Sequence, residues 1–130
     1  MTHTLTIKSR AKTEFIDITD DVQRLVRESG VNSGVCFLYV PHTTAGITIN
    51  EGADPSVKRD ILATVNRLIP FDGDYHHREG NSAAHIKSTI VGVSLFVLIE
   101  DGNPQLGTWQ SVYFCEFDGP RHRRVLVRVT

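Results

Sequence analysis

Two stretches decide the fold: Ser94-Leu-Phe-Val-Leu-Ile-Glu100 and, after a short polar connection, Thr108-Trp-Gln-Ser-Val-Tyr-Phe-Cys-Glu-Phe117. Both are apolar runs of strand length. Consecutive strands with a short connection favour antiparallel pairing, so we expect these two runs to be neighbours in one sheet. Residues 125–129 form a further strand candidate at the end of the chain.

Four more strand candidates precede this region, at residues 4–8, 15–18, 34–40 and 46–50. The first two are separated by a short polar segment, which predicts a strand pair joined by a turn at residues 9–13. The continuous apolar run at 34–40 and the alternation at 46–50 are both typical of strands.

Two segments have the pattern of amphipathic helices. The first has an apolar face of Val22, Leu25 and Val26, a candidate cap at Thr19 or Asp20, and Gly30 as its end. In the second, Asp54 caps the helix with Pro55 at its first position, and the apolar spacing continues until Pro70. A helical turn is also expected at residues 84–90.

The order of these elements predicts the fold class. Strands and helices are grouped and do not alternate strictly, which is typical of an α+β fold. The chain has 130 residues, of which 40% are hydrophobic, and this suits one core. We expect predominantly antiparallel sheets, folded into a sandwich-like single domain over residues 1–130 with two or three helices.

Charge and hydropathy exclude several classes of partner. Lys plus Arg number 14 and Asp plus Glu number 15, so no strong basic field is present to hold a nucleic acid or a membrane surface. The apolar run at 91–99 is far shorter than the roughly 20 residues that span a bilayer. The first residues lack a signal-peptide pattern. Cys36 and Cys115 lie in apolar runs, which predicts reduced thiols and a cytoplasmic location.

Polar side chains gather at the ends of the expected elements, where sites are normally built. The four groups are Pro41 to Thr44, Asn50 to Asp54, His76 to His85, and Gly107 to Gln110. The third group lies in a long polar segment, residues 71–84, and loops of this length in a compact domain are usually functional or disordered.

The histidines suggest a metal site. Neutral imidazole is the commonest protein ligand for zinc, and three protein ligands plus water is the catalytic arrangement. His77 and His85 flank a glycine-containing loop, and His42 would join them from a distant segment. His76 and His77 are adjacent, so at most one of them points inward. The alternative is that these histidines are surface or hydrogen-bonding residues.

Phosphate is the other plausible ligand. The hydroxyls of Thr43, Thr44 and Thr108 are suitable donors. Three arginines, Arg121, Arg123 and Arg124, could pair with phosphate oxygens bidentately. The alternative for Arg121 and the nearby arginines is a solvated surface position. Trp109 is expected either to anchor the core or to stack on a substrate ring. No G-x-S-x-G, P-loop or GxGxxG motif is present, which argues against covalent nucleophile chemistry and a dinucleotide cofactor.

The same residues carry a family resemblance. Ser94, the apolar alternation after it, Gly102 and Gly107-Thr-Trp-Gln-Ser-Val112 resemble the signature of the YjbQ-like family, also called the secondary thiamine-phosphate synthase family. Three further blocks occur in the family's order: Pro41 to Glu51 with Asp54-Pro55, then Tyr75 to Asn81 with His85-Ile-Lys87, then Cys115 to Arg121. The resemblance runs from about residue 5 to residue 129.

This resemblance implies antiparallel sheets with a few helices, assembled as a homotrimer. It also implies a phosphorylated small-molecule substrate and thiamine-phosphate synthase activity, in which a hydroxymethylpyrimidine diphosphate joins a thiazole phosphate and pyrophosphate is released. That activity could be a side reaction of a site evolved for something else. The alternatives are a metal-dependent phosphate-ester hydrolase and a non-catalytic trimer that binds a metal or an anion.

The predicted site combines the resemblance with the donors above. The expected catalytic residues are Asn50, Glu51 and His85. The expected substrate or phosphate contacts are Thr43, Thr44, Asn81, Thr108, Trp109, Gln110 and Arg121. A divalent ion, zinc or magnesium, would be held by His42, His77 and His85. The sequence departs from the family at Ala83, where an acidic residue is usual, so one ligand or proton acceptor is missing.

Overall fold

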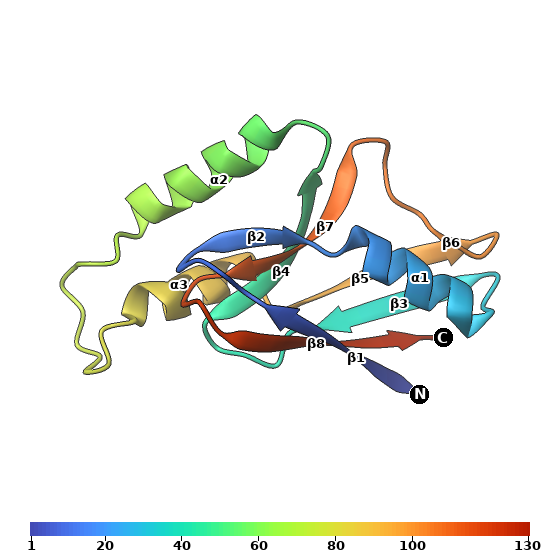
Figure 1. The fold of residues 1–130 in the computed structure, drawn as a ribbon, viewed down its shortest axis with the longest axis horizontal. Helices are drawn as coiled ribbons and strands as arrows, with labels where there is room; N and C mark the ends of the chain where they lie inside the picture. Colours follow the sequence, from blue (N-terminus) through green and yellow to red (C-terminus); the bar gives the residue numbers. More distant parts are fainter.

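The protein forms two antiparallel sheets and three helices (Figure 1). This arrangement comes from a computed structural model that describes residues 1–130. The larger sheet has the order β1 (Thr2–Lys8), β8 (His122–Val129), β3 (Gly34–Tyr39), β5 (Ser94–Glu100) and β6 (Asn103–Pro104). The smaller has the order β2 (Glu14–Asp17), β7 (Gln110–Glu116) and β4 (Ala45–Glu51). The expected α+β fold with mostly antiparallel sheets is confirmed.

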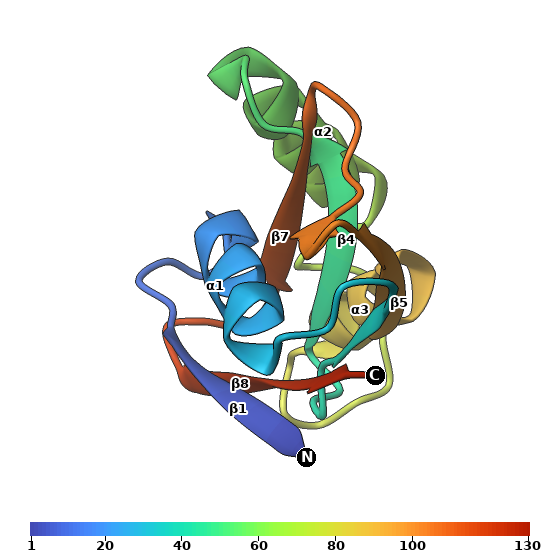
Figure 2. The ribbon, with the colours of Figure 1, turned by 90° about the vertical axis from the view of Figure 1, so that its right-hand side faces the viewer.

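The main core lies between the two sheets and is closed by α1 (Thr19–Ser29) (Figure 2). The predicted face of this helix is buried, and Gly30 ends it in the left-handed conformation with φ of 71°. The cap expected at Thr19 or Asp20 is wrong, because the N-cap is Ile18 and has no capping side chain. The Thr19 hydroxyl instead accepts a hydrogen bond from the Val112 backbone at 2.9 Å, which ties the helix to β7.

The other two helices lie against the smaller sheet. Helix α3 (Ser82–Val91) is longer than the turn expected at 84–90, and its Ser88 hydroxyl donates to the Ala45 carbonyl of β4 at 2.6 Å. Helix α2 (Pro55–Leu68) begins as predicted, with the Asp54 side chain accepting from the Ser56 backbone at 2.9 Å. No side chain of α2 is fully buried, and the helix forms the outer layer in Figure 1.

Two strand pairings expected from the sequence are wrong. Strand β5 pairs with β3 and β6, whereas β7 pairs with β2 and β4 in the other sheet. Likewise, β1 pairs with β8 and β2 pairs with β7. In both cases the short connection carries the chain from one sheet to the other. Strand β7 is buried on both faces, since Val112 and Phe114 belong to the main core and Tyr113 and Cys115 to a second apolar cluster.

Single residues test two further expectations. Trp109 does not anchor the core, since its exposed fraction is 64% and Phe114 and Phe117 fill the interior instead. Cys36 and Cys115 are buried free thiols, as predicted. Burial raises the pKa of the Cys36 thiol to about 11, and it also raises the pKa of Cys115. None of the helices has the length and apolar character needed to cross a membrane.

Candidate functional site

A polar pocket of about 380 Å³ opens where β4 begins and β7 ends. Its lining residues are Pro41, His42, Thr43, Thr44, Glu79, Asn81, His85, Asp118, Arg121 and Arg123. Two further pockets share part of this lining: one of about 430 Å³ includes His42 and Thr43, and both include His85. Almost every lining residue of the first pocket is polar or charged, so it suits a polar ligand.

A buried ion pair forms the floor of this polar pocket. Arg123 has an exposed fraction of 6% and Glu116 of 0%. The Arg123 guanidinium donates from Nε to Glu116 Oε1 at 2.9 Å and from Nη2 to Oε2. Glu116 also accepts from the Ser9 hydroxyl at 2.6 Å and from the Asp118 backbone at 3.0 Å. Burial alone raises the pKa of Glu116, but these hydrogen bonds outweigh it and hold the pKa below its ordinary value.

The arginine of this ion pair also contacts Thr44, a second residue of the pocket lining. Arg123 Nη2 also donates to the Thr44 hydroxyl at 2.8 Å and to the Thr44 carbonyl at 3.2 Å. Because the Thr44 hydroxyl oxygen already accepts a bond, its own proton is available to a ligand. Arg123 Nη1 makes no hydrogen bond within the chain. Both groups belong to side chains that line the pocket.

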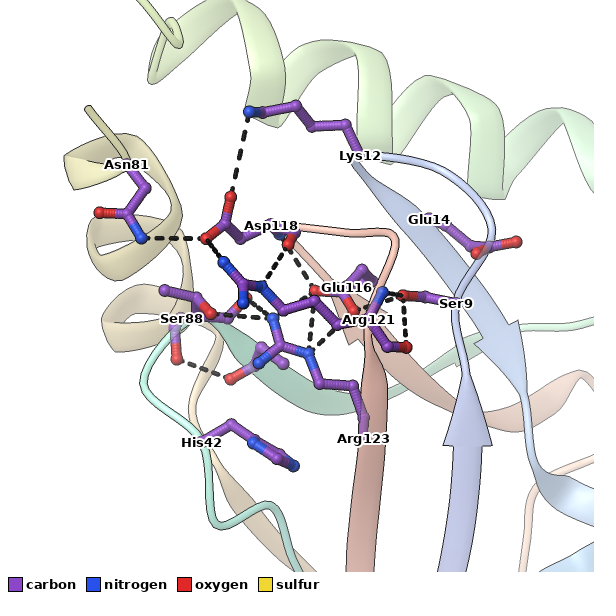
Figure 3. Close-up of polar contacts among 12 residues, drawn as sticks. Ser9, Lys12, Glu14, His42, Asn81, Ser88, Glu116, Asp118, Arg121 and Arg123 are labelled. Carbon is purple, nitrogen blue, oxygen red and sulfur yellow. Dashed lines mark hydrogen bonds and ion pairs between the residues drawn. The ribbon is translucent and has the colours of Figure 1, made fainter. Parts of the chain in front are cut away.

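A second network forms one wall of the pocket, where Lys12, Asn81 and Arg121 converge on Asp118 (Figure 3). Arg121 Nη2 lies 3.0 Å from Asp118 Oδ2. Asn81 Nδ2 donates to the same oxygen at 2.9 Å, and Lys12 Nζ is 3.9 Å from Oδ1. Burial raises the pKa of Asp118, but its hydrogen bonds and the nearby positive charges lower the pKa by more than burial raises it. The pKa of Asp118 therefore lies below its usual value. Arg121 remains half-exposed and accessible to a ligand.

The three histidines predicted as metal ligands do not form one group. His42 Nε2 accepts a hydrogen bond from the Arg124 backbone at 3.0 Å, so the neutral ring carries its proton on Nδ1. Burial, together with the charges of Arg123 and Arg124, lowers the pKa of His42. His77 and His85 lie near each other, with ring centroids 5.3 Å apart and the rings nearly perpendicular.

A divalent ion therefore does not fit the predicted ligand set in this arrangement. With Nε2 occupied and Nδ1 protonated, His42 has no free lone pair for a metal. No three His, Cys, Asp or Glu side chains of the chain are grouped so that they could hold an ion.

The structure brings six predicted site residues into the polar pocket: His42, Thr43, Thr44, Asn81, His85 and Arg121. His77 lines the adjoining pocket that shares His85. Of the residues predicted as catalytic, only His85 is in this group.

Five predicted residues lie elsewhere: Asn50, Glu51, Thr108, Trp109 and Gln110. In the β4–β7 ladder, Ala45 pairs with Glu116 at the pocket end and Glu51 pairs with Gln110 at the opposite end. At about 3.3 Å per residue, these two ends of the strand are about 20 Å apart. Glu51 is engaged locally, where its carboxylate accepts from the Ala53 backbone at 2.8 Å.

Three residues that build the pocket were not predicted: Ser9, Glu116 and Asp118. Glu116 had a detectable signal, because it is an acid inside the apolar run of residues 108–117. A charge in a buried strand requires a partner, and Arg123 follows shortly afterwards in the sequence. Ser9 had no comparable signal, since it contacts Glu116 from the opposite end of the chain.

Comparisons with known proteins agree with this fold. The family model described as UPF0047 protein YjbQ-like matches residues 3–130. A UPF0047 protein of Methanocaldococcus jannaschii is 53% identical over 95% of this chain and 89% of its own length. The UPF0047 protein YugU of Bacillus subtilis is 50% identical over 99% of this chain and 98% of its own.

Solved structures also match closely. A YjbQ/UPF0047 family protein of Clostridium acetobutylicum has a TM-score of 0.97 at 52% identity, covering 98% of this chain and 99% of that one. A protein of Sulfolobus solfataricus, described as being of unknown function, has a TM-score of 0.95 at 30% identity, covering 99% and 95%. With its sequence and its fold both matched over nearly their whole length, the chain belongs to the YjbQ-like UPF0047 protein family.

Proposed function

We propose that the polar pocket binds a phosphorylated small molecule and that the protein acts as a thiamine-phosphate synthase-type enzyme. The observation that carries the proposal is the set of donors on the pocket floor. Arg123 is held by Glu116 and leaves Nη1 and the Thr44 hydroxyl proton without a partner in the chain, and both residues line the pocket together with the accessible Arg121. Charge-assisted donors fixed in this way are the usual means of holding phosphate oxygens.

The reaction class follows from the family resemblance and is compatible with these residues. The thiazole nitrogen forms a bond to the methylene carbon of the pyrimidine while the bond from that carbon to pyrophosphate breaks, and negative charge grows on the pyrophosphate oxygen that leaves. Arg121 and Arg123 would stabilise that charge, because donors already in position need no reorganisation. His42 would add a neutral Nδ1–H donor, and His85 is the candidate acid or base within the pocket.

The proposal includes a homotrimer. Asn50 and Glu51 are far from the pocket of their own chain, so they would take part only from a second copy. An apolar surface suitable for association is present. The outer face of the larger sheet carries no helix (Figures 1 and 2), and it exposes Phe37, Tyr39, Phe96 and Leu98. Large exposed apolar patches of this kind mark interaction sites.

A divalent metal stays a prediction. Binding through His42 requires its ring to leave the Arg124 amide, so we expect the apo protein to show His42 as the Nδ1–H tautomer with a pKa below its ordinary value of 6.5. Nitrogen-detected NMR with added zinc or magnesium tests this. A large shift of the Nε2 resonance on metal addition, with loss of the hydrogen bond from the Arg124 amide, would establish His42 as a ligand, whereas an unchanged ring would exclude it.

The synthase proposal is tested with purified protein and both substrates. We expect thiamine phosphate and pyrophosphate to form together, and Arg121→Gln to weaken binding of the diphosphate about tenfold, the value of one charge-assisted hydrogen bond. Arg24→Gln is the matched control, because Arg24 is on the exposed face of α1. Binding and product formation are measured on the same samples.

Other outcomes identify the alternatives. Release of phosphate or pyrophosphate without the thiazole acceptor would indicate a hydrolase. Binding without any turnover would indicate a non-catalytic module, which the distance of Glu51 from the pocket favours. If Arg121→Gln and the Arg24→Gln control bind the diphosphate equally, the pocket is not the site.

A further inference from the structure

The charges around the polar pocket are balanced. Three cations, Lys12, Arg121 and Arg123, are within or next to its walls. Three acids accompany them: Glu79, Glu116 and Asp118. A pocket that binds a bare phosphate dianion is expected to have an excess of positive charge, and this one has none.

Two of the three acids already have basic partners. Glu116 is paired with Arg123, and Asp118 is paired with Arg121 and lies 3.9 Å from Lys12. These contacts fix the carboxylates in place and give them neutral surroundings, so neither is available to a second cation at close range.

Glu79 is different, because it lines the pocket without a lysine or arginine partner. Its nearest basic group is His77, whose Nε2 lies 3.9 Å from Glu79 Oε2. The Glu79 side chain has an exposed fraction of 76%, so the carboxylate is hydrated and accessible. A ligand phosphate at Arg121 and Arg123 would therefore have an unpaired negative charge at the rim of the same pocket.

We propose that the ligand of this pocket is zwitterionic: a phosphate ester that also carries an amine or another cationic group. The phosphate would lie at Arg121, Arg123 and Thr44, and the cationic group at Glu79. This inference rests on the proposed function, since it assigns the substrate class of the same site. A pocket of about 380 Å³ is large enough for both ends of a small molecule.

Charge neutrality gives this arrangement its selectivity. A ligand with phosphate alone is repelled by Glu79, whereas a ligand with both charges replaces that repulsion by an attraction. Both effects act between partly exposed groups, so they are modest and are screened by salt.

Two probes that differ only in the amine test the inference: phosphoethanolamine and ethyl phosphate. We expect calorimetry at low ionic strength to show about fivefold tighter binding of phosphoethanolamine, as for a solvent-exposed charge pair. Glu79→Gln should remove the preference by weakening phosphoethanolamine and strengthening ethyl phosphate. Glu28→Gln, at an exposed position of α1, is the control because it removes the same charge far from the pocket. This variant should still bind phosphoethanolamine more tightly than ethyl phosphate.

The outcomes separate this inference from the proposed function. Equal binding of the two probes, or a preference that survives Glu79→Gln, would overturn the zwitterion assignment and leave the phosphate site intact. Failure of both probes to bind would overturn the phosphate site as well.

Discussion

Arg123 and Glu116 form a buried ion pair beneath the pocket, with Arg123 Nε 2.9 Å from Glu116 Oε1. The pair connects two neighbouring features, the end of β7 and the start of β8, and its remaining bonds reach Ser9 and Thr44. An arginine that lines the pocket is thus held in place by a carboxylate that is not part of the pocket lining.

Glu116→Ala should destabilise the protein by about 3–5 kcal/mol, because it leaves the Arg123 charge buried without a partner. Denaturant unfolding measures the change. Glu28→Ala, which removes an exposed partner of Arg24, should cost no more than about 1 kcal/mol. The double variant Glu116→Leu with Arg123→Met should recover much of the loss. Equal effects of Glu116→Ala and Glu28→Ala would contradict a buried pair.

Acid should destabilise the fold through the same carboxylates. The pKa values of Glu116 and Asp118 are lowered in the folded protein. In the unfolded chain these carboxyl groups have ordinary pKa values of about 4, so as the pH falls the unfolded chain binds more protons than the folded protein does. The stability that these groups contribute is present above about pH 5 and is lost as the pH falls through their folded pKa values. Urea unfolding between neutral pH and pH 3 should show this loss, with a shallower dependence in Glu116→Gln. Identical slopes in the two proteins would argue against it.

Much of the fold was predictable because its signals are local. Asp54 and Pro55 specify the start of α2 within a few residues, and Gly30 specifies the end of α1. Strand pairing is not a local property. A short connection between β5 and β7 is compatible with both strands in one sheet and with one strand in each sheet. The sandwich separates them, because Asp101 and Gly102, both with positive φ, form a tight turn that pairs β5 with the short β6, and β7 then begins in the other sheet.

The site was predictable where residues with suitable chemistry lie at the end of a strand. Thr43, Thr44 and Arg121 were found in this way and share one pocket. Glu51 and Trp109 lie at strand ends too, but at the opposite end of the same ladder. The end of the ladder at which a residue lies depends on how distant strands are paired. Residue type and position at a strand end do not reveal this pairing, so the sequence analysis assigned residues of both ends to one site.

Lys87 should depend on one hydrogen-bond acceptor for its burial. Its Nζ donates to Asn66 Oδ1 at 2.6 Å, which joins α3 to α2. Burial, and then the nearby charge of Lys12, lower the pKa of Lys87. Asn66→Ala should therefore cost about 1–3 kcal/mol, since a buried donor loses its partner. In a Lys87→Met background the same substitution should cost much less, and a double-mutant cycle from denaturant unfolding measures the coupling. Additive effects of the two changes would contradict the prediction.

The outer face of the larger sheet should be an interface between copies of the chain. Phe37 and Phe96 are paired across β3 and β5, with ring centroids 6.5 Å apart, and Phe96 has an exposed fraction of 60%. Exposed aromatic residues alternate with buried residues along these two strands, so the exposed rings do not contribute to the core. Association with another copy of the chain is the simplest explanation for them. Phe96→Asp should lower the mass seen by light scattering from a trimer toward a monomer. Leu68→Asp, at an equally exposed position at the end of α2, should leave the mass unchanged. If Phe96→Asp keeps the wild-type mass, copies of the chain do not associate through this face, and Glu51 cannot reach a neighbouring pocket by this route.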